Sequence, residues 1–109
     1  MLKSRYREVC ERLDWSVHEY EDGSVDLEKY SPAGEDFVFG ASSENFIREV
    51  KKYAAYFDVD EHVELWVDSR GKNGVPGSIR ELVKDAEAID KMLQELADAL
   101  AEVEDDDDA

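Results

Sequence analysis

The fold is decided by residues 78–103, which read SIRELVKDAEAIDKMLQELADALAEV. Apolar residues recur there at alternating spacings of three and four, which is typical of one buried face of an amphipathic helix. Ser78 and Glu81 form the S-x-x-E pair of a capping box, so we expect the helix to begin at Ser78. The members of the apolar stripe are Ile79, Leu82, Ala86, Ile89, Leu93, Leu96, Leu100 and Val103.

The length of this helix leaves two interpretations of the stripe open. At about 1.5 Å per residue the helix would be roughly 38 Å long, somewhat more than the diameter of a domain of this size. Such a stripe is usually intramolecular core. Because the heptad-like spacing is strict and the helix is long, a seam for self-association is the alternative.

The chain is strongly acidic, with 29 Asp and Glu against 13 Lys and Arg and a formal charge of −16. Residues 14–44 hold nine acidic groups and one basic group, and residues 81–109 hold twelve and two. This charge disfavours nucleic acid and anionic lipid as direct ligands and favours the basic surface of another protein. We therefore expect protein partners and no membrane contact.

The length of 109 residues predicts a single domain, which we place at 1–104, followed by an acidic tail at 105–109. Runs of aspartate such as Asp105 to Asp108 usually form a solvated tail. Cys10 is the single cysteine, which excludes an intramolecular disulfide, and its place in an apolar stripe predicts a small buried hydrophobe. No window has the apolar run of a membrane span or a signal peptide, so we expect a cytoplasmic protein.

Periodicity and turn residues predict an α+β fold: an N-terminal helix, a three-stranded antiparallel sheet, a covering helix, a short helix or strand, and the long C-terminal helix. Residues 58–69 fit either a strand or a helix. A capping pair of Asp58 and Glu61 slightly favours the helix. In chain order the expected elements are a helix at 2–13, strands at 15–20, 25–30 and 36–41, a helix at 43–57, the ambiguous segment at 58–69, a loop at 70–77 and the long helix.

The Asp22-Gly23 step between two β-prone segments predicts a hairpin. A two-residue loop would pair Tyr20 with Val25 and Glu19 with Asp26. One face of the hairpin would then be core, and the other would be acidic. Because like charges opposite each other destabilise a sheet, a different register is the equally weighted alternative. The predicted core face holds His18, Tyr20, Val25 and Leu27, and the predicted acidic face holds Val17, Glu19, Asp26 and Glu28.

Two further details follow from local pattern. The Phe37-Val38-Phe39 run is apolar on both faces, which predicts a central or doubly covered strand after the turn at 31–34. Ser43 is the expected N-cap of the covering helix.

Catalytic and metal-binding patterns find little support. The cluster of Asp60, Glu61, His62 and Glu64 could ligate a metal, but the only other histidine, His18, belongs to a different element. There is no G-x-S-x-G elbow, and the glycines at 71–77 lack the pattern of a P-loop. We expect no enzyme activity, no cofactor and no metal.

Three stretches carry a resemblance to known proteins: YSPAGEDF at 30–37, the segment from Asp58 to His62 with Trp66, and GVPGSIRELVKDAEAI at 74–89. In their order and amino-acid sequence these stretches resemble small acidic proteins encoded on mobile genetic elements of gut Firmicutes. The resemblance spans about residues 15–103 and includes no catalytic motif. It implies a setting in which anti-CRISPR and antirestriction proteins occur, and it assigns no roles to individual residues.

Together, charge and setting predict an inhibitor of a host defence nuclease, for example Cas9, that presents carboxylates where nucleic-acid phosphates would lie. The alternative is a helical interaction module, such as a homodimer formed through the C-terminal helix, whose charge serves only solubility. The residues expected to bind the partner are Glu19, Asp26 and Glu28 on the hairpin and Glu81, Asp85, Glu87, Glu95 and Asp98 on the long helix.

Overall fold

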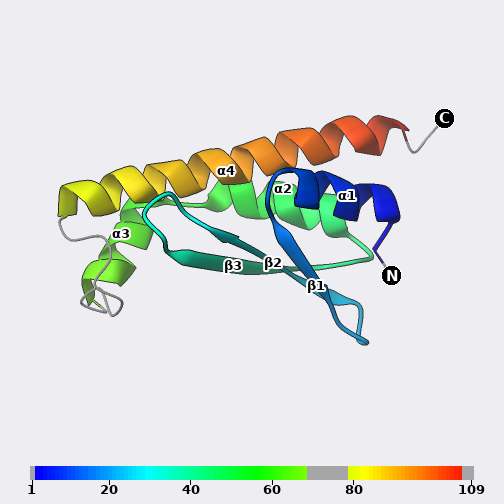
Figure 1. Ribbon diagram of the computed structural model, residues 1–109, viewed down its shortest axis with the longest axis horizontal. Coiled ribbons are helices and arrows are strands. Elements are labelled where there is room, and N and C mark those ends of the chain that lie inside the picture. The colour runs from blue at the N-terminus through cyan, green and yellow to red at the C-terminus, as the bar shows by residue number, and fades with distance from the viewer. Residues whose placement is uncertain (1, 69–78, 107–109) are drawn as a thin grey trace.

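The computed structural model describes residues 2–68 and 79–106 and has the expected α+β architecture (Figure 1). A three-stranded antiparallel sheet lies on one side of the molecule and the helices lie on the other. The predicted Ser78 capping pair and the loop at 70–77 lie outside the described residues. The elements are α1 (Ser4–Arg12), β1 (Ser16–Glu19), β2 (Ser24–Tyr30), β3 (Asp36–Ser42), α2 (Phe46–Tyr56), α3 (Val59–Asp68) and α4 (Ile79–Asp106).

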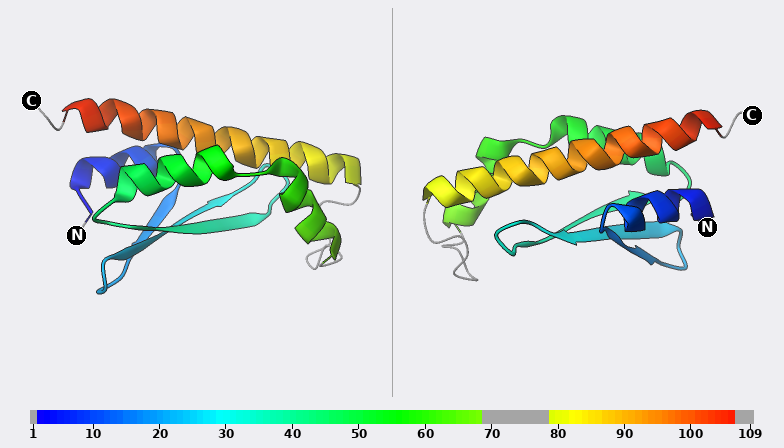
Figure 2. Two further views of the ribbon diagram at one scale, coloured as in Figure 1. Left: turned by 180° about the vertical axis from the view of Figure 1, so that it is seen from behind. Right: turned by 45° about the horizontal axis from the view of Figure 1, so that its top comes forward.

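Helix α4 runs along the long axis of a molecule that measures 48 × 27 × 21 Å. Its apolar stripe is buried from Leu82 to Leu100, and Val103 packs partly buried against the same core. The two further views place α2 and α3 along one side of α4 and α1 along the other (Figure 2). The domain is elongated enough to cover the stripe from Leu82 to Leu100, so this part of the stripe does not extend beyond the domain. The helix itself continues to Asp106, into the segment expected to be tail.

The first helix anchors the sheet to α4. Tyr6, Val9 and Cys10 face the core, and burial raises the pKa of the Cys10 thiol to about 12. Cys10 is therefore the buried small hydrophobe that its position predicts. Asp14, with a φ of 69°, turns the chain so that Trp15 packs edge-on against Phe39 in the core.

The hairpin register differs by one residue from the predicted two-residue loop. Glu19 lies opposite Val25, and Val17 opposite Leu27. The loop is longer because the Tyr20 N–H donates to the Ser24 carbonyl, with Gly23 at a φ of 90°. This register buries Val17 and moves His18 to the outer face.

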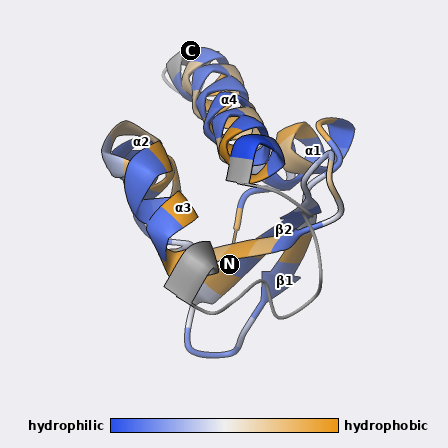
Figure 3. Cartoon of the chain, turned by 90° about the vertical axis from the view of Figure 1, so that its left-hand side faces the viewer, coloured by the Kyte–Doolittle hydropathy of each residue, from blue (hydrophilic) through white to orange (hydrophobic). Residues whose placement is uncertain are grey.

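Strand β3 lies at the edge of the sheet rather than at its centre, in the order β1-β2-β3. Phe37, Phe39 and Ala41 face the core, while Val38 is 47 % exposed on the side that no helix covers. The expectation of a central or doubly covered strand is therefore wrong. Figure 3 looks along the molecule and shows α4 lying between α1 and α2, with the sheet opposite them.

The caps of the next two helices show one wrong and one confirmed expectation. Asn45, not Ser43, takes the N-cap position of α2, and Glu49 from the first turn reaches back to the Ser42 N–H at 2.7 Å. Residues 59–68 form a helix, as slightly favoured, and Asp58 Oδ1 accepts the Glu61 N–H at 3.2 Å. None of the helices in the described ranges combines the length and the apolar character that a membrane crossing requires.

Candidate functional site

The outer face of the sheet is open, because every described helix packs on the other face (Figures 1 and 2). The observed register and the alternation of side chains along a strand decide which residues share this open face. Three large side chains are well exposed there: Tyr20 at 51 %, Tyr30 at 65 % and Val38 at 47 %. The residues of the open face are His18, Tyr20, Asp26, Glu28, Tyr30, Asp36, Val38 and Gly40.

The open face is acidic and has no balancing Lys or Arg among the strand residues. Asp26, Glu28 and Asp36 lie on it, and Glu21 and Asp22 extend the negative charge to the tip of the hairpin. Lys29, the only Lys or Arg in the three strands, belongs to the opposite face, where its ammonium donates to the Leu13 carbonyl at 2.8 Å and lies over the Trp15 ring. Among the described strand residues, the Asp, Glu, Lys and Arg side chains on the open face are therefore all negative.

Hydrogen bonds hold the carboxylates of the open face in place. The Tyr20 hydroxyl donates to Asp26 Oδ2 at 3.0 Å, and His18 Nε2 lies 3.2 Å from Glu28 Oε1. A hydrogen bond between Glu28 and Asp36 raises the pKa of Asp36 and lowers the pKa of Glu28.

Glu19 was predicted to share the acidic face with Asp26 and Glu28, and this is wrong. The register turns Glu19 to the side of α1, where its carboxylate accepts hydrogen bonds from the Arg7 guanidinium and from the Leu2 N–H at 2.9 Å. The bond from Arg7 is the main reason that the pKa of Glu19 is lowered. Its charge is thus already neutralised within the molecule.

Asp85 is the second correction among the predicted partner-binding residues. Its side chain is buried, accepting the Ser31 hydroxyl at 2.6 Å and the Ala33 N–H at 3.0 Å. These bonds tie the turn after β2 to α4. Asp85 therefore stabilises the fold and is not available to a partner.

The other predicted helix residues lie on the exposed side of α4, away from the open face of the sheet. Cations lie among them: Arg80, Lys84 and Lys91 are exposed on the same side. The structure therefore divides the predicted set between two opposite surfaces, and among the described residues the sheet surface carries no Lys or Arg while the α4 surface does. The helix residues concerned are Glu81, Glu87, Glu95 and Asp98.

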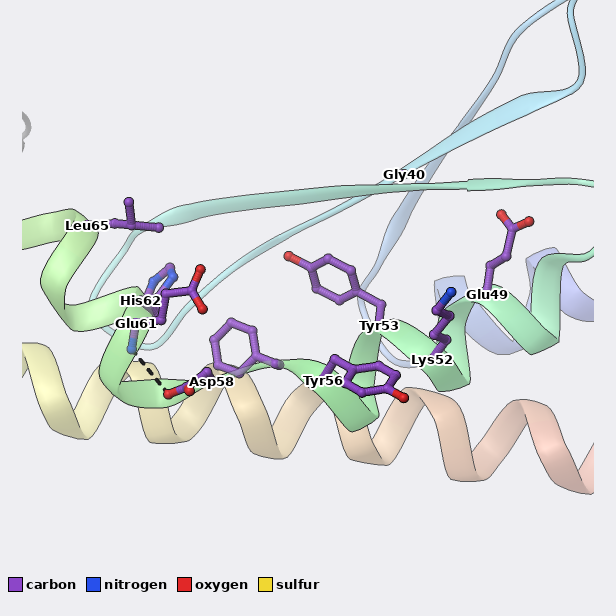
Figure 4. A pocket seen from close by; sticks show the side chains of 10 residues that line it. Gly40, Glu49, Lys52, Tyr53, Tyr56, Asp58, Glu61, His62 and Leu65 are labelled. Carbon is purple, nitrogen blue, oxygen red and sulfur yellow. Dashed lines mark hydrogen bonds between the residues drawn. The ribbon is translucent and has the colours of Figure 1, made fainter.

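A groove of about 560 Å³ lies beside the free edge of β3, between this strand and helices α2 and α3 (Figure 4). Tyr53 points across it toward the strand and stacks on Phe39 with ring centroids 4.5 Å apart. Tyr56 and Leu65 are 78 % and 61 % exposed at its rim. The groove is lined by Gly40, Glu49, Lys52, Tyr53, Tyr56, Phe57, Asp58, Glu61, His62 and Leu65.

The sequence alone does not reveal this groove, because the groove depends on which strand lies at the edge of the sheet. The aromatic residues Tyr53, Tyr56 and Phe57 are the sequence feature that points to it. They lie close together at the end of a helix, where one buried face cannot cover all of them, so exposed aromatic surface is expected there. His62, considered above as a metal ligand, instead points inward to Glu35, with Nε2 3.0 Å from Oε2. In residues 2–68 and 79–106, no group of three or more His, Cys, Asp or Glu side chains is placed to hold a metal.

Comparison with known proteins yields no relationship: no family model, no curated protein and no solved structure matches the chain.

Proposed function

We propose that this protein is an acidic inhibitor that binds the basic nucleic-acid channel of a bacterial defence nuclease, of the Cas9 or restriction type, through the open face of its sheet. The observation that carries the proposal is that this face presents Asp26, Glu28 and Asp36 on adjacent strands of the sheet, with no Lys or Arg on the same face among the described strand residues. Such an inhibitor would act in the cytoplasm, where the nuclease works, as the resemblance to proteins of mobile elements also suggests.

The geometry of a sheet suits this role. Asp26 and Glu28 lie on one face of one strand, so their backbone positions are about 6.6 Å apart, and the next strand is about 4.8 Å away. Channels that hold nucleic acid are lined with Lys and Arg and contact the backbone rather than the bases. Tyr20 and Tyr30 add exposed aromatic rings, which attract the same cations.

The test uses two variants that remove the same number of carboxylates from opposite surfaces. The open-face variant is Asp26→Asn, Glu28→Gln and Asp36→Asn, and the matched control is Glu87→Gln, Glu95→Gln and Asp98→Asn on α4. Binding to a guide-loaded Cas9-type nuclease and to a restriction nuclease is measured by titration at several salt concentrations, together with DNA cleavage. We expect the open-face variant to lose affinity about tenfold or more, the control to lose less than about threefold, and the wild type to weaken steeply with salt.

Equal losses in both variants would show that net charge alone is responsible and would contradict the assignment of the open face. Wild-type binding that stays constant from low to high salt, or no effect on any nuclease tested, would contradict the function itself. The burial of the stripe from Leu82 to Leu100 beneath α1, α2 and α3 supports the inhibitor over a homodimer formed through that stripe.

A further inference from the structure

The two edge strands of the sheet, β1 and β3, differ in how far other parts of the chain cover their outer edges. Along β1, α1 covers the edge, and Arg7 Nη1 donates to the Val17 carbonyl at 3.4 Å. Along β3, the only such contact is at the strand's end, where Glu49 accepts the Ser42 N–H at 2.7 Å within the described part of the chain. The edge of β3 is therefore the one that is open to pairing.

The hydrogen-bond pattern shows which backbone groups point outward from β3. The Ser43 N–H donates to the Gly23 carbonyl at 2.8 Å, so this pair is of the hydrogen-bonded kind. Such pairs alternate along an antiparallel ladder, which directs the backbone of Phe37, Phe39 and Ala41 toward β2. The N–H and C=O groups of Val38 and Gly40 then point away from the sheet. They meet no hydrogen-bonding partner among residues 2–68 and 79–106.

The groove lies directly beside these outward groups, and the Gly40 backbone lines it. A strand added to β3 would run about 4.8 Å from it, and its side chains would alternate between the two faces. One set would enter the groove beside the aromatic ring of Tyr53 and the apolar side chains of Phe57 and Leu65. The other set would lie on the open face, next to Asp36.

The charge around this edge selects the occupant. Among the described residues that line the groove, Glu49, Asp58 and Glu61 are acidic and Lys52 is the one Lys or Arg, and the open face adds the carboxylates described above. A second copy of the chain, itself carrying a charge of −16, would bring like charges together along the new pair of strands. A basic segment would be attracted by the negative charge around this edge, whereas a second copy of the chain would be repelled by it.

We infer that the edge of β3 binds an extended segment of the partner protein, with apolar and basic residues in alternation, as a fourth strand of the sheet. Main-chain bonds to Val38 and Gly40 hold the segment, and the groove selects its apolar side chains. The inference rests on the proposed function for the identity of the partner, since it describes how a basic partner is held. The strand addition itself is tested separately with synthetic peptides.

The first experiment uses a short blocked peptide of alternating lysine and valine and a control peptide of the same composition with all lysines at one end. Amide hydrogen exchange of the protein is measured with each peptide by NMR. We expect the alternating peptide to slow exchange at Val38 and Gly40 by about tenfold or more and the control peptide to have little effect. Equal binding of both peptides, or binding without protection of these two amides, would overturn the inference.

The second experiment compares Val38→Pro with Val38→Thr. Proline removes the outward N–H of an edge strand without removing a bond to β2, whereas threonine is also β-branched and keeps the N–H. We expect the proline variant to bind the alternating peptide about tenfold more weakly and the threonine variant to bind within about twofold of wild type. Thermal unfolding shows whether each variant is folded. If the proline variant is unfolded, the hydrogen-exchange experiment on the wild type tests the strand addition by itself.

The two proposals can fail separately. If the open-face variant weakens nuclease binding while Val38→Pro binds peptide and nuclease as the wild type does, the proposed function stands and the strand addition is wrong. If Val38→Pro alone loses the alternating peptide and no nuclease responds to the protein, the strand addition stands and the nuclease is the wrong partner.

Discussion

Asp85 shows how a single carboxylate can be structural in a protein whose surface is full of them. Its two oxygens accept the Ser31 hydroxyl and the Ala33 N–H, and its side chain is only 4 % exposed. Buried groups of this kind are costly to leave without partners. The turn after β2 therefore depends on this one residue of α4.

We predict that Asp85→Ala lowers the free energy of unfolding by about 1–3 kcal/mol, because the Ser31 hydroxyl and the Ala33 N–H lose their acceptor. The control is Asp98→Ala, an exposed position on the same helix, which should change stability by less than about 0.5 kcal/mol. Urea unfolding of both variants at neutral pH measures the difference. Similar values for the two variants would show that the buried bonds contribute nothing.

Glu19 gives a prediction that depends on pH. Because its pKa is lowered in the folded protein by the Arg7 guanidinium, its stabilisation is present above its unfolded pKa of about 4.3 and is lost as pH falls through the folded value. Glu19→Gln should therefore be less stable than wild type by about 0.5–1 kcal/mol at pH 7, with a smaller difference at pH 3. Chemical unfolding at both pH values measures it, and a difference that grows toward low pH would contradict the assigned sign.

The structural roles of Asp85 and Glu19 could not be predicted from the sequence. Asp85 and Ser31 are 54 residues apart, and Arg7 and Glu19 are 12 residues apart on different elements. A carboxylate on a helix or strand looks the same in a sequence whether its partner is a distant hydroxyl or a cation on another molecule. Asp26 and Glu28, by contrast, do lie on an acidic outer face, because alternation along one strand is a local property.

At the scale of the elements, the hairpin illustrates the limit of turn signals. The Asp22-Gly23 step marks the turn correctly, yet the register slips by one residue because the loop includes Glu21. A shift of one residue exchanges the two faces of a strand. Burial of Val17 instead of His18 favours the observed register, and this preference is visible only once the core is known.

The long helix is the element that the sequence predicts best, and its packing can be tested directly. We predict that Leu96→Ala lowers the free energy of unfolding by about 2–5 kcal/mol, because Leu96 is fully buried and the substitution leaves a cavity. The matched control is Leu65→Ala on α3, where the side chain is 61 % exposed and the change should stay within about 0.5 kcal/mol. Thermal or urea unfolding distinguishes them, and equal losses would place Leu96 outside the core.

At the scale of the whole molecule, the excess of negative charge produces electrostatic repulsion that destabilises the folded state, and packing of the core must outweigh this repulsion. Glu95, Asp98 and Glu102 follow one another at spacings of three and four on the exposed side of α4, where like charges repel. Lys51 offsets one neighbour, Glu104, through an ion pair of 3.1 Å. The remaining repulsion is long-ranged at low salt and is screened at high salt.

We predict that the thermal unfolding midpoint rises between about 20 mM and 500 mM sodium chloride, by about 4–8 °C for each kcal/mol of repulsion that is screened. Glu95→Gln, Asp98→Asn and Glu102→Gln together should flatten this dependence. Calorimetry across the salt series measures both. A midpoint that falls with salt in the wild type would mean that favourable ion pairs outweigh the repulsion.

The sequence by itself determined the order of the elements, the type of each except α3, and the buried stripe of α4, because each follows from periodicity and turn residues within a short stretch of chain. For α3 it only favoured a helix over a strand. It also determined the excess of negative charge. Only the tertiary structure decided that β3 is the edge strand, that the carboxylates divide between two opposite surfaces, and that Glu19 and Asp85 are engaged within the molecule. These facts depend on contacts between residues far apart in the chain, where side-chain identity alone does not specify the partner.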